Sequence, residues 1–397
     1  MQETGIGKSG VIAIIIVIFI TTGYGWHLYS KTSTASNILA SALPSSAQEN
    51  SPTPTVSQTP AVAPIAFPTV SHIQTPSQVH AIYISSWSAG TASSMAHINA
   101  LLDGGKINAV VIDIKDATGR LSYIPHDPIL AASGVGTKRI AHLDTLIQSL
   151  HDRHIYVIGR IAVFQDPYWP TVHPEDALQD TTTGNPWKDK KGLTWLRADN
   201  PKVWSYIESV AEDAYAQGFD EVNMDYVRFP TDGALKNIDQ STFTLPKQNI
   251  IESFFADLDT ILRQKDHIPL SADVFGLTVS AEDDMGIGQK LDLIAAHVDY
   301  ICPMIYPSHF ANGSYGFKNP ADHPYEVIAK ALLDGKAKLT AVNISTTKLR
   351  PWLQDFNLGA IYTADMVTAQ IKATNDAGIT SWLMWDASNK YTSSVYK

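Results

Sequence analysis

The sequence of 397 residues has only one cysteine, Cys302. A single cysteine allows no internal disulfide and no zinc site built from cysteines, and its apolar neighbours predict a buried core residue. Histidine pairs at metal-ligand spacing are also absent, because neither His-x-His nor His-Glu-x-x-His occurs. No Gly-x-Ser-x-Gly motif is present, which disfavours a serine hydrolase. The sequence therefore predicts no metal site.

Positive charge is also scarce. Lysine and arginine number 29 against 39 acidic residues, which gives a formal net charge of -10 at pH 7. No segment clusters basic residues as phosphate binding requires, so the sequence predicts no nucleic-acid partner. Residues 86–90 follow the first predicted strand in place of a glycine-rich turn, and the glycine-containing residues 5–9 have no strand before them. We therefore predict no cofactor.

A long apolar run at residues 11–20 continues to Trp26 and Tyr29 and predicts a membrane span over about residues 11–29. The competing interpretation is a cleaved signal peptide, but the small-x-small site at residues 40–42 lies far beyond the run. We predict that residues 1–29 form a transmembrane signal anchor of a single-pass protein of the cell membrane, with the remaining chain extracytoplasmic. Cleavage would give a secreted form.

Residues 30–77 are rich in Ser, Thr, Pro, Ala and Gln and have too few large apolar side chains to build a core. This composition predicts a disordered, partly extended linker that holds a domain away from the membrane. The remaining residues 78–397 are long enough for one large globular domain.

Apolar, β-branched runs alternate with amphipathic stretches throughout residues 78–397, which is typical of βα repeats around a parallel sheet. Eight strands favour a closed (β/α)8 TIM barrel of the α/β class over a doubly wound open sheet, whose dinucleotide fingerprint is missing. The seventh strand is the weakest because Pro351 removes a backbone donor, and residues 339–344 are the alternative. The predicted strands are residues 81–85, 109–115, 155–163, 221–229, 270–275, 300–306, 349–354 and 381–386.

Several predicted strands carry an acid near their ends, although strands of a parallel sheet are normally apolar throughout. In a TIM barrel the carboxyl ends of the strands carry the active site. One ionised and one protonated carboxyl group are what glycoside hydrolysis requires. We predict that Asp225 is the catalytic anion, stabilised by Arg228, and that Asp273 is the catalytic acid, its pKa raised by apolar neighbours.

Other charged and aromatic side chains near the predicted strand ends are candidates for substrate binding, because aromatic faces stack on sugar rings and charged groups bind sugar hydroxyls. Each has a structural alternative: ion pairs at the barrel rim for the charged residues, core packing for the aromatic residues and turn capping for Asp273. Arg160 can pair with Asp113 or Asp225. The candidates are Asp113, Lys115, Arg160, Arg228, Trp87, Tyr306, Trp385 and Asp386.

The connection at residues 165–200 is long and has little periodicity, as expected of a loop that covers a site. It contains Trp169, Trp187 and Trp195. We predict that this loop shapes substrate access and that Trp169 and Trp187 contribute to binding more than to stability.

Four stretches in order resemble a bacterial family of glycoside hydrolase-like barrels: Asn223 to Pro230, residues 271–276, residues 351–356 and residues 385–388. The likeness spans nearly all of residues 80–390 and implies a TIM barrel distantly similar to those of α-amylase-type enzymes. In those enzymes the nucleophile ends strand four and the acid ends strand five, which implies these roles for Asp225 and Asp273. This sequence departs from them in having Asn223 where they have arginine and an aspartate where their acid is glutamate.

These observations predict a membrane-anchored, extracytoplasmic glycoside hydrolase whose partner is an oligo- or polysaccharide. Two other hypotheses remain. A glycan-binding barrel without catalysis would need the aromatic residues but no carboxylate pair. A structural envelope protein would use the barrel as a spacer or docking surface.

Overall fold

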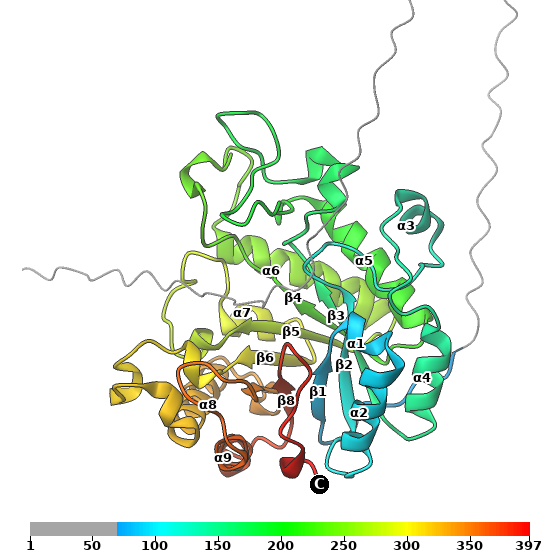
Figure 1. Ribbon diagram of the computed structural model, residues 1–397. Helices are drawn as coiled ribbons and strands as arrows, with labels where there is room; N and C mark the ends of the chain where they lie inside the picture. The colour runs from blue at the N-terminus through cyan, green and yellow to red at the C-terminus, as the bar shows by residue number, and fades with distance from the viewer. Residues whose placement is uncertain (1–69) are drawn as a thin grey trace, which may run out of the picture. The chain divides into compact units, whose positions relative to one another are not determined.

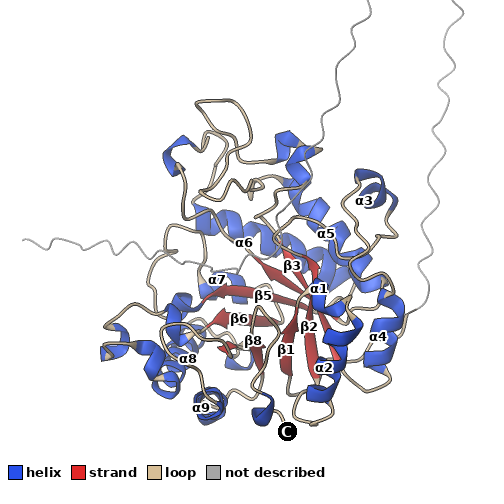
Figure 2. Ribbon diagram, in the orientation of Figure 1, coloured by secondary structure: helices blue, strands red, loops and turns tan. Residues whose placement is uncertain are grey.

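The computed structural model describes residues 70–397, which form a closed barrel of eight parallel strands in chain order. Figure 2 shows the strands at the centre with helices around them, and Figure 1 labels the elements. Because β1 pairs with both β2 and β8, no sheet edge is left open, and the predicted TIM barrel is confirmed. The strands are β1 (His80–Ile84), β2 (Ala109–Lys115), β3 (Tyr156–Ala162), β4 (Glu221–Asp225), β5 (Leu270–Phe275), β6 (Tyr300–Met304), β7 (Trp352–Gln354) and β8 (Trp382–Trp385).

The helices pack their apolar faces against the barrel. In α5, for example, Val203, Ile207, Val210 and Ala214 recur at helical spacing and are buried. This helix begins where the Asn200 side chain accepts a hydrogen bond from a free backbone N–H of the first turn. The helices are α1 (Ser86–Ala89), α2 (Ala92–Leu102), α3 (Pro128–Ser133), α4 (Leu143–His151), α5 (Pro201–Ala216), α6 (Lys247–Leu258), α7 (Leu291–Ala295), α8 (Pro324–Ala341) and α9 (Ala364–Asp376).

Two strands, β4 and β6, end two or more residues earlier than predicted. β4 ends at Asp225, because Tyr226 adopts a positive φ of 54° and turns the chain away from the sheet, and β6 ends at Met304. β7 has only three residues and pairs with β6 at a single position, as expected from Pro351 immediately before it. The alternative seventh strand at residues 339–344 is wrong, since this stretch contains the end of α8.

The amino-terminal half of the barrel interior contains a buried polar network. Glu221 accepts hydrogen bonds from Nη1 of Arg350 (2.8 Å), the hydroxyl of Ser271 (2.6 Å) and the hydroxyl of Tyr156 (3.1 Å). A buried charge is costly unless it is paired and hydrogen-bonded, and Glu221 satisfies both conditions. Strands β3, β4 and β5 are therefore connected by polar contacts below the level of their carboxyl ends.

Residues 70–79 contact the amino-terminal end of the barrel before β1 begins. The backbone N–H of Ile73 donates to Asp220 (2.8 Å), which immediately precedes β4, and the Thr75 hydroxyl lies 2.9 Å from that of Tyr156 at the start of β3. The folded part therefore includes residues 70–77, where the composition predicts linker.

The predicted signal anchor at residues 11–29 and the linker up to residue 69 lie outside the described residues. Within residues 70–397, no helix combines the length and the apolar character that a membrane span requires.

Candidate active site

Arg160, in β3, lies at the centre of a group of buried carboxyl groups. Its Nη1 donates to Oδ1 of Asp113 in β2 (2.6 Å), and its Nε and Nη2 both donate to Oδ2 of Asp225 in β4, the former at 3.0 Å. Nε also lies 3.9 Å from Oδ2 of Asp273 in β5. One guanidinium therefore connects four adjacent strands, and both predicted partners of Arg160 are confirmed. We call these four residues the Arg160 cluster.

Strand register explains why these residues meet. Asp113 aligns with Arg160 across β2 and β3, and Met224 aligns with Ala272 across β4 and β5, which puts the following residues, Asp225 and Asp273, at one level. Side chains of alternate residues point into a barrel. The register thus brings Asp225 and Asp273, the predicted catalytic pair, to the same level on neighbouring strands.

Asp225 ends β4 and accepts hydrogen bonds on both carboxylate oxygens. Oδ2 accepts from Arg160, and Oδ1 accepts from the backbone N–H of Tyr226 (2.6 Å). Charged donors and backbone N–H groups around one carboxylate stabilise its anionic form. Asp225 is suited to act as the anion of the pair.

Asp273 has a contrasting environment, since only 1% of its surface is exposed. Burial and then the neighbouring charge of Asp225 raise its pKa to about 8, against the opposing effects of Arg160 and of two hydrogen bonds. Both hydrogen bonds reach Oδ1, from the indole N–H of Trp352 (2.6 Å) and the amide of Asn223 (2.9 Å). Because Oδ1 accepts both N–H groups, Oδ2 is the oxygen of Asp273 that can carry a proton.

Aromatic rings line one side of the Arg160 cluster. The Tyr83 hydroxyl donates to Oδ2 of Asp113 (2.6 Å), and Trp385 stacks on the Tyr83 ring with centroids 4.0 Å apart. The Arg160 guanidinium lies 5.2 Å from the Trp385 centroid. Burial raises the pKa of Asp113, and Arg160 opposes that effect. Trp385 remains partly exposed, so the structure brings this predicted residue to the cluster without burying it fully.

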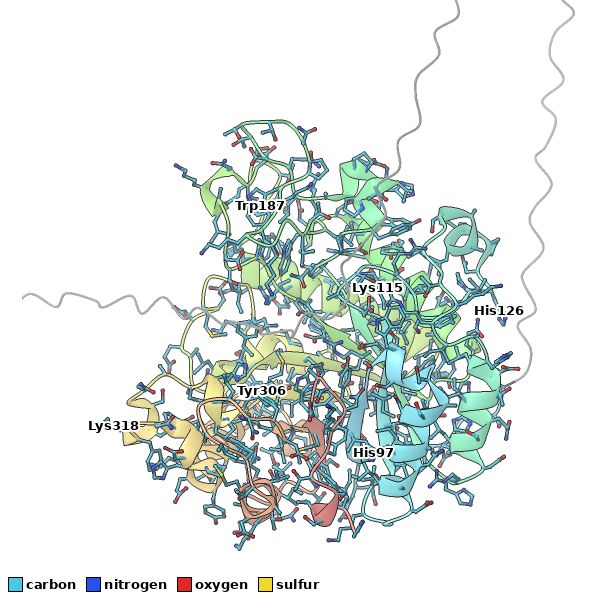
Figure 3. The ribbon with its side chains drawn as sticks, viewed as in Figure 1. His97, Lys115, His126, Trp187, Tyr306 and Lys318 are labelled. Atoms are coloured by element: carbon cyan, nitrogen blue, oxygen red, sulfur yellow. The ribbon has the colours of Figure 1, made fainter. Side chains whose placement is uncertain are left out.

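Three other predicted binding residues lie near strand ends and form no hydrogen bond with the cluster, although the charges of Asp273 and Asp225 add to burial in raising the pKa of Tyr306. Tyr306, labelled in Figure 3, is buried and packs edge-on against His309 and Phe356. Asp386 caps the turn after β8 by accepting from the N–H and hydroxyl of Ser388, each at 2.7 Å. Trp87, by contrast, is 65% exposed in α1 and forms an open aromatic surface.

Arg228 is not the direct ionic partner of Asp225, although the two charges attract each other as the prediction held. The guanidinium that pairs with Asp225 comes from Arg160 on the neighbouring strand, whereas Nη1 of Arg228 donates to the carbonyl oxygen of Phe229 (3.0 Å). The turn at Tyr226 accounts for the difference, because it carries the chain out of the barrel between Asp225 and Arg228.

Lys115 is also placed differently from the prediction, which made it a substrate-binding residue. It is fully buried at the end of β2, where Nζ lies 2.8 Å from Oδ2 of Asp166 and donates to the carbonyl oxygen of Ala162 (2.5 Å). Figure 3 labels Lys115. Its role is to fix the loop after β3, which corresponds to the structural alternative.

Replacing Lys115 with methionine is expected to lower the free energy of unfolding by about 3–5 kcal/mol, because Asp166 would keep a buried, unpaired charge. Urea unfolding followed by circular dichroism measures this. Lys372→Met is the matched control: Lys372 pairs with Asp376 on an exposed helix surface, and its loss should cost about 0.5 kcal/mol or less. Equal effects of the two substitutions would contradict the structural role of Lys115.

The tryptophans of the loop at residues 165–200 form its core and do not line an open surface. Trp169, Trp187 and Trp195 are all buried, and the indole N–H of Trp187 donates to the carbonyl oxygen of Ala234 (3.1 Å). Trp187 lies in the loop region at the top of Figure 3. The prediction that Trp169 and Trp187 contribute more to binding than to stability is wrong, because the loop folds on its own aromatic side chains.

Trp187→Ala is therefore expected to destabilise the protein by about 3–5 kcal/mol through the cavity it leaves. Trp87→Ala, at an exposed position, should change the unfolding midpoint little. Thermal denaturation of both variants compares the two sites directly. A small effect at Trp187 would show that the loop does not depend on this side chain.

One group of side chains within residues 70–397 has the spacing of metal ligands. His173, Glu175 and Asp176 each offer an atom within 4.8 Å of the others. Both oxygens of Asp176 already accept hydrogen bonds, from the indole of Trp169 (2.9 Å) and from Asn200 (3.0 Å). These contacts explain Asp176 as a connection within the loop.

The sequence interpretation did not identify Tyr83, Asn223 and Trp352 as contacts of the carboxyl groups. Tyr83 lies within a strand, and alternation alone would have directed its side chain inward with the cluster. Trp352 and Asn223 belonged to the stretches that carried the family resemblance, but their hydrogen bonds to Asp273 depend on strand register.

Comparison with known proteins identifies the family of this chain. A family model described as a putative glycosyl hydrolase domain matches residues 81–391. The chain belongs to this family. No curated protein matches the sequence. The barrel is thus glycosidase-like, as the resemblance implied.

Among solved structures, a hypothetical protein from Ruminiclostridium thermocellum is 32% identical, with 52% of this chain and 98% of that chain covered and a TM-score of 0.45. The glycoside hydrolase domain of PgaB (BpsB) from Bordetella bronchiseptica is 13% identical, with coverages of 79% and 95% and a TM-score of 0.58. The second likeness establishes a shared barrel fold.

Proposed function

We propose that this protein is a membrane-anchored, extracytoplasmic glycoside hydrolase that cleaves a polysaccharide with Asp225 and Asp273. One observation carries the proposal: two carboxyl groups on adjacent strands lie beside one guanidinium, and Asp225 is hydrogen-bonded to it, whereas Oδ2 of Asp273 lies 3.9 Å away and burial raises the pKa of Asp273. Paired carboxyl groups with unlike environments are the requirement of acid-assisted glycoside cleavage.

In the reaction, Asp225 attacks the anomeric carbon while Asp273 donates the proton on Oδ2 to the departing glycosidic oxygen. The bond between that carbon and oxygen breaks, and a glycosyl ester of Asp225 forms. Asp273, now anionic, takes a proton from water as the water attacks the ester, which restores both carboxyl groups. Asp225, at 7% exposed, is the carboxylate that a substrate reaches first.

The geometry favours retention of anomeric configuration. Oδ2 of Asp225 and Oδ2 of Asp273 lie 3.0 Å and 3.9 Å from the same Nε. The two oxygens are therefore no more than roughly 7 Å apart. Carboxyl groups of retaining enzymes are about 5 to 5.5 Å apart, within this limit, whereas those of inverting enzymes are about 6.5 to 9.5 Å apart and mostly exceed it.

Membrane attachment is proposed from the apolar residues 11–29 and the linker-like composition of residues 30–69. The full chain should partition into the membrane fraction of a bacterial host, and a chain from residue 70 should not. Recovery of both in the soluble fraction would contradict attachment.

A screen of defined polysaccharides for released reducing ends tests the catalytic proposal, with Asp225→Asn as the inactive control. Glycan binding without cleavage by the wild-type protein would favour the non-catalytic barrel. Absence of both binding and cleavage would favour the structural role.

A further inference from the structure

Arg228 differs from the other buried arginines in lacking a carboxylate partner. Arg160 pairs with Asp113 and Asp225, and Arg350 pairs with Glu221. Arg228 is only 8% exposed, yet within residues 70–397 it has no ion pair and a single hydrogen bond, to a backbone carbonyl. A buried guanidinium without an anion is costly, so its presence at this position requires an explanation.

Aromatic rings surround this guanidinium. Its central carbon lies 4.8 Å from the Trp195 centroid, 5.0 Å from Phe275 and 5.6 Å from Tyr226. The rings come from the loop after β3 and from the ends of β4 and β5, so Arg228 lies at the carboxyl end of the barrel. Ring faces stabilise a cation, but they do not satisfy the in-plane N–H groups of a guanidinium.

The acids nearest to Arg228 are engaged elsewhere. Asp225 accepts from Arg160 and from a backbone N–H. Asp189 accepts from the backbone N–H of Leu193 (3.0 Å) and the indole of Trp195 (3.1 Å), and Asp232 accepts from the backbone N–H of Lys190. Burial lowers the pKa of Arg228, and these acids compensate only in part. The guanidinium thus has donor capacity that the described protein groups leave unused.

We propose that Arg228 binds the carboxylate of an acidic sugar, so that the substrate is a glycan containing hexuronic acid residues. This inference rests on the proposed function for the position of the sugar. A guanidinium presents two parallel N–H groups that match a carboxylate, and the surrounding rings hold its plane in place. The site would accept one acidic sugar beside the Asp225 and Asp273 pair.

Binding experiments with Asp225→Asn protein test the inference without turnover. Titration calorimetry compares hexuronic acid oligosaccharides of several defined linkages with their carboxyl-reduced counterparts. At least one acidic oligosaccharide should bind about tenfold or more tightly than its reduced form. A second substitution in the same protein, Arg228→Gln, should remove that difference in affinity. Arg228→Lys keeps the positive charge and should retain part of this affinity difference. It therefore distinguishes an effect of the lost charge from an effect of misfolding.

Arg120→Gln is the matched control, because Arg120 also lies over an aromatic ring, that of Tyr168, and donates only to backbone carbonyls. It should leave the preference unchanged. Equal binding of acidic and reduced forms, or an equal loss for both in Arg228→Gln, would overturn the inference. Tight binding of an acidic glycan that the wild-type protein does not cleave would support it and contradict the hydrolase proposal alone.

Discussion

Asp225→Asn is expected to reduce glycan cleavage by at least about a thousandfold while the barrel remains folded. The substituted amide has nearly the same shape and Arg160 keeps its ion pair with Asp113, so the barrel should stay folded. The amide NH2 cannot accept one of the hydrogen bonds that Asp225 accepts, so some stability should be lost. The nucleophilic oxygen, however, loses its charge. Initial rates on the glycan identified by screening, together with thermal unfolding, measure both effects.

Asp355→Asn is the matched control for this experiment. Asp355 also follows a strand, but its oxygens accept from the Thr392 hydroxyl (2.6 Å) and the Tyr396 hydroxyl (2.8 Å). Its substitution should lower stability and leave the rate per folded molecule largely unchanged. A variant that keeps full activity without Asp225 would remove this residue from the mechanism.

The pH dependence of cleavage should show an alkaline limb set by Asp273. Acid catalysis needs the protonated carboxyl group, and the pKa of this group is raised to about 8. Activity should therefore hold below that pH and fall tenfold per unit above it. Asp273→Asn should remove the limb, and substrates with good leaving groups should recover much of the rate because they need no proton.

The position of the limb can be changed through Trp352. Its indole N–H stabilises the Asp273 anion and lowers the pKa, so Trp352→Phe should raise the pKa and move the limb to higher pH. Trp382→Phe is the control, because Trp382 is a buried strand residue whose indole N–H has no hydrogen-bond partner among residues 70–397. A limb that moves equally in both variants would rule out the assignment to Asp273.

Strand number and order were accessible from the sequence because apolar runs and helical stretches alternate regularly over the whole barrel. The placement of Asp225 and Asp273 followed from the same pattern, since carboxyl ends of parallel strands meet at one end. The ionic partner of Asp225 could not be predicted from this pattern. Arg228 is near Asp225 in sequence, whereas Arg160 is 65 residues away and reaches it through the pairing of β3 with β4.

The tryptophans of the loop at residues 165–200 show a second limit. A segment without periodicity gives no indication of which side chains are buried. Its aromatic residues can therefore be interpreted equally well as ligand contacts or as core residues. Trp187 proved to be core, while Trp87, in a four-residue helix, is exposed. Lys115 likewise required three-dimensional information, because its partner Asp166 comes from the loop after the next strand.

The contacts of residues 70–79 bear on how a polymer would gain access. Thr75 and Ile73 attach this segment to the starts of β3 and β4, at the pole of the barrel opposite the Arg160 cluster. With the proposed membrane attachment, the chain would join the barrel at this end, away from the Arg160 cluster. A long polysaccharide would then reach the Arg160 cluster without passing the point of attachment.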